Sequence, residues 1–568
     1  MNLSFKGRIR TVYFLILMIA GLITARLFFV QVVKGEYYEG LAAKQYFSSN
    51  LEDFNRGDIF FTEKSGNHIS AAVVKKGYQV AINPKVLKDH QNIYEKISRI
   101  IKIDKDSFFE KASRSDDPYE VVARQVGEDA ALKIKDLKIA GVNAFPESWR
   151  YYPSDDLASH VLGFVGYKGD KLTGRYGIEL QYENALKREE TSGKNNSFAE
   201  LFFDIKSLIA GEDKSGDIIL TIEPSAQAML EKKLSDVKNK YKAEMTAGLV
   251  ISPKTGKIMA MGANPDFDPN QYAKTKDFSA FINPLVENIY EMGSIAKPLT
   301  MAAGLDTGVV TSRTEYVDNG YIDFGSARIR NYDGKARGKA DMQKVLNDSL
   351  NTGVVFVMQQ TGKDKFRDYM LSYGFGEKTG IELPHEAKSN ISNLLNNSRD
   401  IEFATASFGQ GIAVTPVAMA AALSSLANGG VIMRPYIVQE EARKGLKNKQ
   451  TQPLEIRRAL KKETSEEITR MLVEVVDSAL LGGKYKMEHY SVAAKTGTAQ
   501  LAQGKDGYRD GEFMHTFFGY APAFDPEFLI LLFAIKPKGE QYASHTLTEP
   551  FMEITKFLLN YYEVPPDR

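Results

Sequence analysis

The first strong pattern along the chain is an apolar run close to the N-terminus. From Thr11 to Val33 the sequence reads TVYFLILMIAGLITARLFFVQVV, 23 residues that are interrupted only by Arg26 and Gln31. At about 1.5 Å per residue, a helix of this length can cross the hydrocarbon core of a bilayer. No later segment is apolar for long enough to do the same. The pattern therefore predicts one transmembrane helix at residues 11–33.

Basic residues next to this run predict its orientation. Lys6, Arg8 and Arg10 precede it, and an excess of such residues favours the cytoplasmic side. We therefore expect a cytoplasmic tail at residues 1–10, a single pass through the cytoplasmic (inner) membrane, and an extracytoplasmic body. A cleaved signal peptide is the alternative, although Ile23 fits poorly as the small residue expected before a cut after Ala25.

Beyond the apolar run, the pattern changes to short and mixed elements. Strand-like runs such as YQVAI alternate with helical patterning such as EDAALKIKDLK, and both kinds continue to about residue 210. The polar stretch REETSGKNNS, Arg188–Ser197, predicts a loop near a boundary. Residues 34–210 are accordingly predicted to form an N-terminal domain of mixed structure, called the pedestal below.

A second domain is predicted at residues 211–568. The segment GDIILTIEPSAQAMLEKKLSDV reads as a strand followed by a helix, with Ser225 as a candidate N-cap. Two apolar runs, Ala247–Ile251 and Lys257–Met261, are joined by SPKTG and predict a hairpin. Further along, Pro416 favours a helix start and Gly429 its end. These elements indicate that a new domain begins here.

Composition narrows the classes of function. The chain has 568 residues, of which 43% are hydrophobic, and this is more than one core requires. With 73 basic against 72 acidic residues, no charge excess is available to neutralise a nucleic acid. The chain has no cysteine, which excludes disulfides, thiolate metal sites and cysteine nucleophiles.

The tripeptide Lys-Thr-Gly occurs three times, and its settings differ. The copy at Lys254 lies in the turn of the predicted hairpin, and the copy at Lys378 follows the helical segment KFRDYMLSYGFG, so both fit turn or loop chemistry. The copy at Lys495 lies in the strand-like run YSVAAKTGTAQLA, where a lysine could face a cleft. Only this third copy is therefore a candidate for chemistry.

Two further short motifs precede Lys495. Ser294 and Lys297 form Ser-x-x-Lys, whose spacing on a helix places an amine beside the hydroxyl that it must deprotonate. Ser349 and Asn351 follow in LNDSLNTG. Each motif alone has an ordinary structural interpretation, as a helix cap or a polar turn. Their succession, with Lys495 third, is what indicates a catalytic site.

This ordered set, Ser294-Ile-Ala-Lys297, Ser349-Leu-Asn351 and Lys495-Thr496-Gly497, resembles the motifs of penicillin-binding proteins and class A β-lactamases. Other segments are similar to blocks of class B, monofunctional penicillin-binding proteins: RYYPSDDLASHVLGFVG, GRYGIELQYENAL, TGKIMAMGANPDFDPNQY, SFGQGIAVTPVAMA and HTFFGYAPAFDPE. The likeness covers nearly the whole chain. It is nearest to the division-type transpeptidases of septal wall synthesis, with the elongation type as an alternative.

The resemblance implies a fold as well as an activity. It implies an α/β (α+β) domain built on an antiparallel five-stranded sheet with flanking helices, preceded by a dimerisation-like pedestal. Ser294 would lie at the start of a helix that faces the strand carrying Lys495. The implied reaction is cross-linking of peptidoglycan stem peptides that end in D-Ala-D-Ala.

The resemblance also implies a role for each motif residue. Ser294 would attack the penultimate carbonyl, and Lys297 would be the base, which requires a pKa lowered by burial and by the cation Lys495. Ser349 would relay a proton to the leaving D-Ala nitrogen. Asn351 would hold the donor amide and also Lys297.

The strand of Lys495 would bind the rest of the donor. Lys495, Thr496 and Thr498 would hold the terminal carboxylate, and Gly497 would let the substrate backbone lie against the strand. Backbone N–H groups of Ser294 and Thr498 would form the oxyanion hole. No metal or organic cofactor is needed, and His160 and His515 are interpreted as structural because the reaction needs no imidazole.

The implied partners are stem peptides on a lipid-linked precursor or on nascent glycan, β-lactams as inhibitors, and a membrane-embedded glycosyltransferase with division proteins. A D,D-carboxypeptidase or a β-lactam-hydrolysing or β-lactam-sensing enzyme would use the same motifs, with water in place of the acceptor amine. The long pedestal favours transfer, because it would lift the site towards the wall. A non-enzymatic division scaffold is the remaining alternative, which the complete motif set disfavours.

Overall fold

The computed structural model describes residues 5–29, 54–169, 171–188, 216–395, 399–443, 447–502 and 507–568. The chain divides into two compact units: Met1–Asn55 with Val74–Trp149, and Arg56–Val73 with Arg150–Arg568. The predicted boundary near residue 210 lies outside the described residues, as does most of the loop predicted at Arg188–Ser197.

The N-terminal helix differs from its prediction. Helix α1 covers Phe5–Phe28 and so includes the basic residues that were expected to precede it. Lysine and arginine are good helix formers, so a basic flank does not by itself start or stop a helix. In the described part of the chain, no helix meets the combined length and apolar character that a membrane crossing requires.

The first unit packs helices against strands. Its helices are α3 (His90–Ser98), α4 (Lys105–Ala112) and α5 (Glu128–Asp136), and its strands are β3 (Glu120–Val126) and most of β4 (Val142–Tyr151). Strand β2 (His68–Ile82) is shared: its later residues pair with β3, and its earlier residues pair with β1 (Ile59–Thr62) of the second unit. Apolar side chains such as Val80, Ile97 and Phe108 form the core of the first unit.

A buried ionic network in the second unit joins segments far apart in sequence. Glu179 is fully buried and accepts from Nε of Arg56 and from Nε of Arg150, both at 2.6 Å. Tyr152 donates to the same carboxylate at 3.1 Å, and Glu183 binds Arg56 at 2.7 Å. Burial opposes the charged form of Glu179, but the two guanidinium groups prevail and lower its pKa. The segments RYYPSDDLASHVLGFVG and GRYGIELQYENAL therefore meet in one place.

Short elements surround this network. They are β5 (Val165–Lys168) paired with β6 (Lys171–Gly174), and the helices α6 (Ser159–Leu162), α7 (Gly177–Gln181) and α8 (Glu183–Leu186). Strand β7 (Gly216–Leu220) pairs with β1 and with β15 (Val438–Arg443), which in turn pairs with β16 (Lys449–Gln450).

The predicted antiparallel five-stranded sheet is confirmed. Its order is β18 (Ala493–Ala502), β19 (Tyr508–Ala521), β20 (Phe528–Ile535), β8 (Met245–Ile251) and β9 (Ile258–Asn264). The hairpin predicted around SPKTG is the β8–β9 pair. Strand β18, which carries Lys495, lies at one edge of the sheet, so one side of it is free to pair with another backbone.

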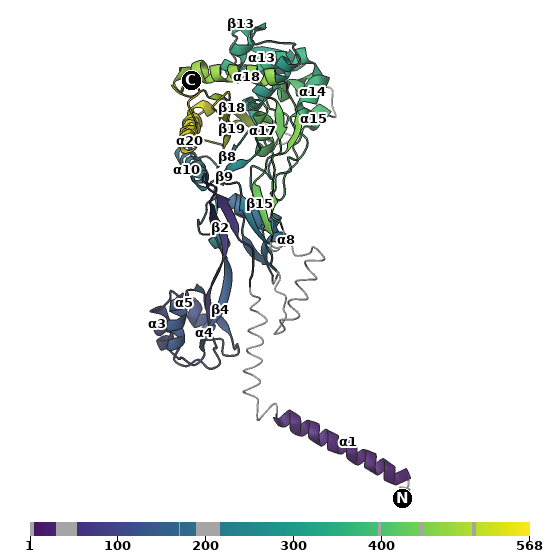
Figure 1. Ribbon diagram of the computed structural model, residues 1–568, viewed down its shortest axis with the longest axis vertical. Helices are drawn as coiled ribbons and strands as arrows, with labels where there is room; N and C mark the ends of the chain where they lie inside the picture. Colours follow the sequence, from purple (N-terminus) through teal and green to yellow (C-terminus); the bar gives the residue numbers. More distant parts are fainter. Residues whose placement is uncertain are drawn as a thin grey trace. The chain divides into compact units, whose positions relative to one another are not determined.

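Helices cover both faces of this sheet (Figure 1). Along β20, Ile530 and Leu532 pack with α10 (Pro224–Tyr241) and α20 (Thr548–Tyr561), whereas Leu529 and Leu531 pack on the other face. This alternation follows from the two-residue period of a strand. Helices on the second face include α11 (Lys297–Asp306), α13 (Asn351–Thr361), α16 (Asp400–Ala406), α17 (Pro416–Ser424) and α18 (Lys462–Glu474).

Two local predictions in this domain had different outcomes. Pro416 begins α17, as predicted. The N-cap of α10 is Glu223 and not Ser225, because the Glu223 carboxylate accepts from the Ala226 N–H at 2.6 Å and Pro224 occupies the first helical position. A carboxylate is also favoured there by the helix dipole.

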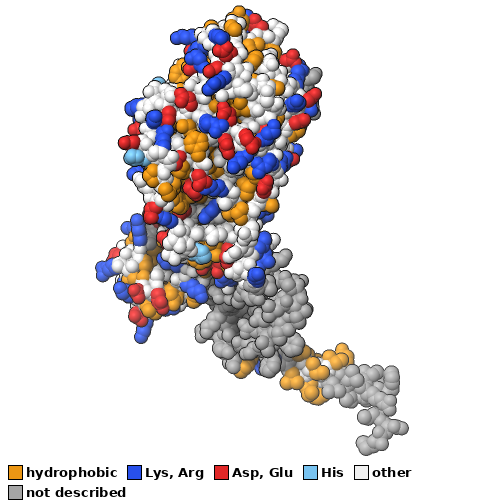
Figure 2. Space-filling model, turned by 45° about the horizontal axis from the view of Figure 1, so that its top comes forward, with side chains coloured by type: hydrophobic (Ala, Val, Ile, Leu, Met, Phe, Trp, Pro, Cys, Tyr) orange, Lys and Arg blue, Asp and Glu red, His pale blue; other side chains and the backbone are white. Residues whose placement is uncertain are grey.

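The remaining described elements complete the second unit. They are β10 (Glu315–Asp318), β11 (Tyr321–Phe324), β12 (Ala327–Arg330), β13 (Gly338–Asp341), β14 (Val431–Met433), β17 (Glu455–Arg458), α12 (Met342–Asn347), α14 (Lys363–Ser372), α15 (Ser392–Leu395), α19 (Ala543–Thr546), and the short helices η2 (Pro269–Lys274), η3 (Phe278–Phe281), η4 (Gly293–Ala296), η5 (Val475–Ala479) and η6 (Leu480–Gly483). On the face drawn in Figure 2, basic and acidic side chains are interspersed.

Candidate active site

Ser294 lies where a tight helical turn becomes an α-helix. The turn η4 covers Gly293–Ala296, and α11 begins at Lys297. Side chains three apart eclipse one another in a 3₁₀ turn, so Ser294 and Lys297 share one side of it. Gly293 has φ +64°, and a side chain there would approach Ala499 of β18 at 2.9 Å. The serine turn is therefore held directly against the strand of Lys495.

Lys297 is buried beneath the serine turn, with only 1% of its surface exposed. Its Nζ donates to the Ser349 carbonyl at 2.5 Å and to the Ser349 hydroxyl at 3.1 Å. Burial lowers the pKa of Lys297 well below its usual value, and the positive charge of Lys495 lowers it further. The structure thus supplies the lowered pKa that a lysine base requires.

Ser349 lies in the short connection between α12 and α13, and Asn351 follows it at the start of α13. Ser349 has φ +54°, a left-handed conformation that few non-glycine residues adopt, and this conformation directs both of its oxygens to Lys297. Asn351 begins α13, and its Nδ2 donates to the Arg330 carbonyl at 2.8 Å. In the described part of the site no hydrogen bond joins Asn351 to Lys297, so Ser349 holds the lysine in place of the expected Asn351.

Lys495 is the second buried lysine of the site, with 3% of its surface exposed. Its Nζ donates to the Thr496 carbonyl at 3.1 Å, and no carboxylate pairs with it among the described residues. Burial lowers the pKa of Lys495 to about 8. At neutral pH this is a cation without a counterion, which favours an anionic ligand.

A cavity of about 860 Å³ opens in front of these residues. Six of the eight predicted site residues line it: Ser294, Ser349, Asn351, Lys495, Thr496 and Thr498. Lys297 and Gly497 lie behind this lining. The Thr498 hydroxyl accepts from the Ala543 N–H at 3.2 Å, which ties the strand to the segment that begins α19.

Close packing requires a glycine at position 497. A Cβ there would lie 2.3 Å from the Thr516 hydroxyl and 3.0 Å from the Ile295 backbone nitrogen. Any larger residue would therefore press β18 away from the serine turn. The role expected for Gly497 in contacting the substrate backbone stays a prediction.

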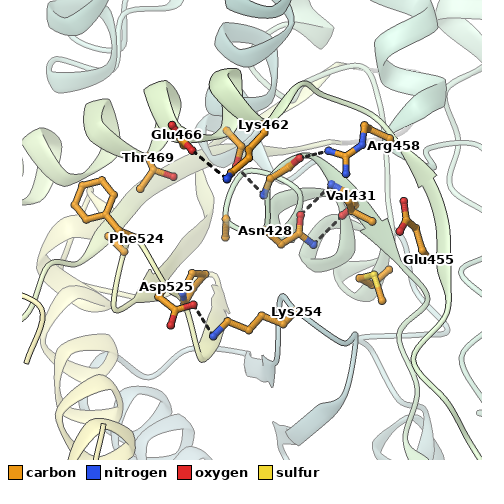
Figure 3. A pocket seen from close by; sticks show the side chains of 16 residues that line it. Lys254, Asn428, Val431, Glu455, Arg458, Lys462, Glu466, Thr469, Phe524 and Asp525 are labelled. Carbon is orange, nitrogen blue, oxygen red and sulfur yellow. Dashed lines mark hydrogen bonds and ion pairs between the residues drawn. The ribbon is translucent and has the colours of Figure 1, made fainter. Parts of the chain in front are cut away.

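The lysine of the first Lys-Thr-Gly copy lines a different cavity, of about 630 Å³ (Figure 3). Lys254 is 39% exposed, and its Nζ contacts Asp525 at 2.6 Å and Glu527 at 2.8 Å. Burial opposes its charge, but the two carboxylates prevail and raise its pKa. The second copy, at Lys378, lies in the connection after α14. Both copies are loop features, as predicted.

A buried polar network behind Asn351 escaped the sequence analysis. Thr352 donates to Asp318 at 2.7 Å, and the Asn331 amide donates to the same carboxylate at 2.9 Å. Arg337 N–H adds a third bond to Asp318 at 2.8 Å. The three side chains Asp318, Asn331 and Thr352 are each at most 3% exposed. No local pattern marks them, although Thr352 directly follows the motif asparagine.

His160 and His515 both make structural contacts. His515 is buried and contacts the Thr546 hydroxyl at 2.8 Å and the Gln541 carbonyl at 3.1 Å, and His160 packs on Phe267. Burial lowers the pKa of each histidine to about 4. Within the described ranges no group of three or more His, Cys, Asp or Glu could hold a metal ion.

Comparison with known families and proteins gives a consistent result. Residues 246–556 match the penicillin binding protein transpeptidase domain, and residues 55–196 match the penicillin-binding protein dimerisation domain. Stage V sporulation protein D of Bacillus subtilis is 30% identical over 97% of this chain and 85% of its own length. The peptidoglycan D,D-transpeptidase FtsI of Escherichia coli is 28% identical over 78% of this chain and 73% of its own length.

Solved structures support the same fold. Penicillin binding protein 2X from Streptococcus thermophilus superimposes with a TM-score of 0.71 at 20% identity, over 90% of this chain and 80% of that one. Penicillin binding protein 3 from Mycobacterium tuberculosis, in complex with aztreonam, gives a TM-score of 0.68 at 21% identity, over 90% and 97% of the two chains. At this identity the likeness establishes the fold.

Proposed function

This chain belongs to the class B penicillin-binding proteins, and we propose that it is a serine D,D-transpeptidase that cross-links peptidoglycan stem peptides in septal wall synthesis. One observation carries the proposal at the level of residues. Two buried lysines, Lys297 and Lys495, lie beside Ser294 without a carboxylate partner in the described part of the site. A lysine that is neutral near pH 7 can act as a base, and a lysine that stays charged can hold a carboxylate.

In the first half of the reaction, the Ser294 hydroxyl attacks the carbonyl of the penultimate D-Ala. A bond forms between Oγ and that carbon, the amide C–N bond breaks, and terminal D-Ala leaves. The proton of the hydroxyl passes to the unprotonated form of Lys297, which the lowered pKa makes more accessible. Ser349 bridges Lys297 and the cavity, since it receives the lysine's hydrogen bonds and also lines the cavity. It is therefore placed to return the proton to the leaving nitrogen.

The strand β18 holds the donor during this step. The charge on Lys495, with the hydroxyls of Thr496 and Thr498, provides a site for the terminal carboxylate. Backbone N–H groups of Ser294 and Thr498 would stabilise the oxyanion, each by typically about 3 to 4 kcal/mol of the barrier.

In the second half, the amine of another stem peptide attacks the ester. The new amide bond forms, Oγ leaves and recovers a proton, and Ser294 is regenerated. Water in place of the amine would give a carboxypeptidase or, with a β-lactam, a hydrolase. The relatives' names and the match to a transpeptidase domain favour the amine.

The proposal includes a single-pass anchor in the cytoplasmic membrane, with the N-terminus inside and the catalytic domain outside. Large apolar side chains of α1 are exposed, among them Phe14, Leu17 and Leu22, each more than 60%. Such surface requires lipid or another protein to cover it. Carbonate extraction of membranes and protease protection of tagged termini test the anchor; release of the chain by carbonate would refute it. A membrane-embedded glycosyltransferase and division proteins are the proposed partners.

Intact-mass spectrometry of the full-length chain with benzylpenicillin tests the nucleophile. We expect one stable adduct on the parent protein, none on Ser294→Ala, and an unchanged adduct on the matched control Ser279→Ala, which changes an exposed serine. Rapid penicillin turnover without an adduct would establish a hydrolase. A folded protein with neither adduct nor turnover would refute the enzymatic function and favour a scaffold.

A further inference from the structure

The charged lining of the active-site cavity is unbalanced. Its described cations are Arg328, Arg330 and Lys495, whereas Asp348 is its one described carboxylate. Asp348 is in turn paired with Arg337 at 3.4 Å and with Lys344 at 3.0 Å, and neither of these residues lines the cavity. The cavity therefore presents an excess of positive charge, beyond the single cation that the terminal carboxylate of a donor would require.

One of the two arginines is already engaged. Arg328 binds both oxygens of Asp323, through Nε at 2.5 Å and Nη2 at 2.8 Å. Its guanidinium also lies 4.0 Å from the centre of the Tyr321 ring. These contacts occupy one hydrogen-bonding edge and one face of the Arg328 guanidinium. The Asp323 carboxylate is likewise engaged, because its hydrogen bonds with Arg328, with a smaller contribution from the charge of Arg330, lower its pKa.

Arg330 differs from Arg328 although the two residues lie on the same face of β12. Ile329 between them is buried, as strand alternation requires. The side chain of Arg330 is exposed, and it makes no ion pair within the described part of the chain. Its backbone is fixed, because the Arg330 carbonyl accepts from the Asn351 amide at 2.8 Å. Arg330 thus lies beside a motif residue of the active site, and its charge acts on Asp323 without forming an ion pair with it.

We propose that Arg330 binds a carboxylate of the donor peptide, located on the N-terminal side of the two D-alanines. This inference rests on the proposed function, which places the terminal carboxylate at Lys495 and the donor amide at Asn351. The peptide then runs from Lys495 past Ser294 to Asn351, and continues towards Arg330. A guanidinium suits this task because it can hold a carboxylate through two parallel hydrogen bonds.

Paired donors test the proposal with the full-length chain. One synthetic peptide carries glutamate directly before D-Ala-D-Ala and the other carries glutamine, so they differ only in charge. The measured quantity is the second-order rate constant of acyl-enzyme formation, in the absence of an acceptor amine. We expect the parent to favour the glutamate donor by about twofold to fivefold, the range for one exposed ion pair. Arg330→Gln should reduce this ratio to about one, and Arg330→Lys should retain part of it.

Two controls keep the outcomes distinct. Lys335→Gln removes a nearby exposed charge that does not line the cavity, and it should leave the ratio unchanged. Benzylpenicillin acylation of Ser294 in every variant reports on the proposed function itself. Two outcomes overturn the assignment of Arg330 to the donor when penicillin still acylates the parent. The first is a donor ratio near one. The second is a preference for the glutamate donor that appears only when an acceptor amine is present. Equal ratios in the parent and Arg330→Gln would also overturn it.

Discussion

Two cavities of this protein each have the lysine of a Lys-Thr-Gly tripeptide in their lining, and only one is suited to chemistry. Lys254 is partly exposed and paired with two carboxylates, and its cavity has three basic and three acidic residues. Lys495 is buried and lacks such a partner in the described structure. The comparison teaches that burial without a counterion, and not the tripeptide, makes the charge of a lysine available to a ligand. Water and carboxylates stabilise the charge of Lys254, whereas the charge of Lys495 is left for a ligand.

The largest expected effect comes from Lys297→Arg. Arginine keeps the charge but cannot lose its proton at accessible pH. Acylation of Ser294 by benzylpenicillin should therefore fall by on the order of 1,000-fold, within the range for loss of a general base. Stopped-flow or quenched mass measurements give the rate. Near-parent acylation by a folded Lys297→Arg variant would rule out Lys297 as the base.

A direct test of the comparison uses the two lysines of the tripeptides. Lys495→Met should slow acylation by on the order of 100-fold, since it removes the buried charge that we propose holds the substrate carboxylate. Lys254→Met removes only an exposed ion pair, so acylation should stay within about twofold of the parent. The same rate assay measures both variants. If Lys254→Met and Lys495→Met lowered the acylation rate by similar factors, the two cavities would not differ in their suitability for chemistry.

The glycines of the first and third tripeptides, Gly256 and Gly497, test the same difference between the two cavities. Gly497→Ala would place a methyl group against Thr516 and the turn that carries Ser294, and we expect acylation to fall by on the order of 10-fold to 100-fold. Gly256→Ala disturbs a loop with φ +80°, so it should lower thermal stability with little change in the acylation rate of the folded protein.

Relief of the closest contact provides a check on this explanation. Thr516→Ala removes the nearest atom to the new methyl group, so the double variant should recover part of the lost rate. A double variant no faster than Gly497→Ala would assign the loss to another cause.

The smallest expected effect is the pH dependence. Acylation should rise with pH as Lys297 loses its proton, because its folded pKa is lowered. It should fall above about pH 8 as Lys495 loses the charge that holds the carboxylate, by about tenfold from pH 7 to 9 for one such group. In Lys495→Met the fall should vanish, and the rise should move to higher pH, because the repulsion that lowers the pKa of Lys297 is gone. A descending limb that persists in this variant would contradict the assignment.

Predictions from local patterns are confirmed at two places. The alternation around SPKTG predicted the β8–β9 hairpin, and Pro416 predicted the start of α17. The predicted N-cap of α10 was wrong, because Glu223 and not Ser225 caps the helix. The N-terminal helix begins at Phe5, before the predicted membrane segment, because basic residues also form helices, and residues 30–33 of that segment lie outside the described residues.

The amino-acid sequence by itself determined the motif residues, the kind of fold and the order of Ser294, Ser349 and Lys495 along the chain. Only the tertiary structure decided which hydrogen-bond and ion-pair partners the residues in and around the site have. It directs Lys297 to Ser349, leaves Arg330 without an ion pair in the described chain, and buries Asp318 behind Asn351. The physical reason is that burial and charge pairing depend on segments that are distant in sequence, so no local pattern records them.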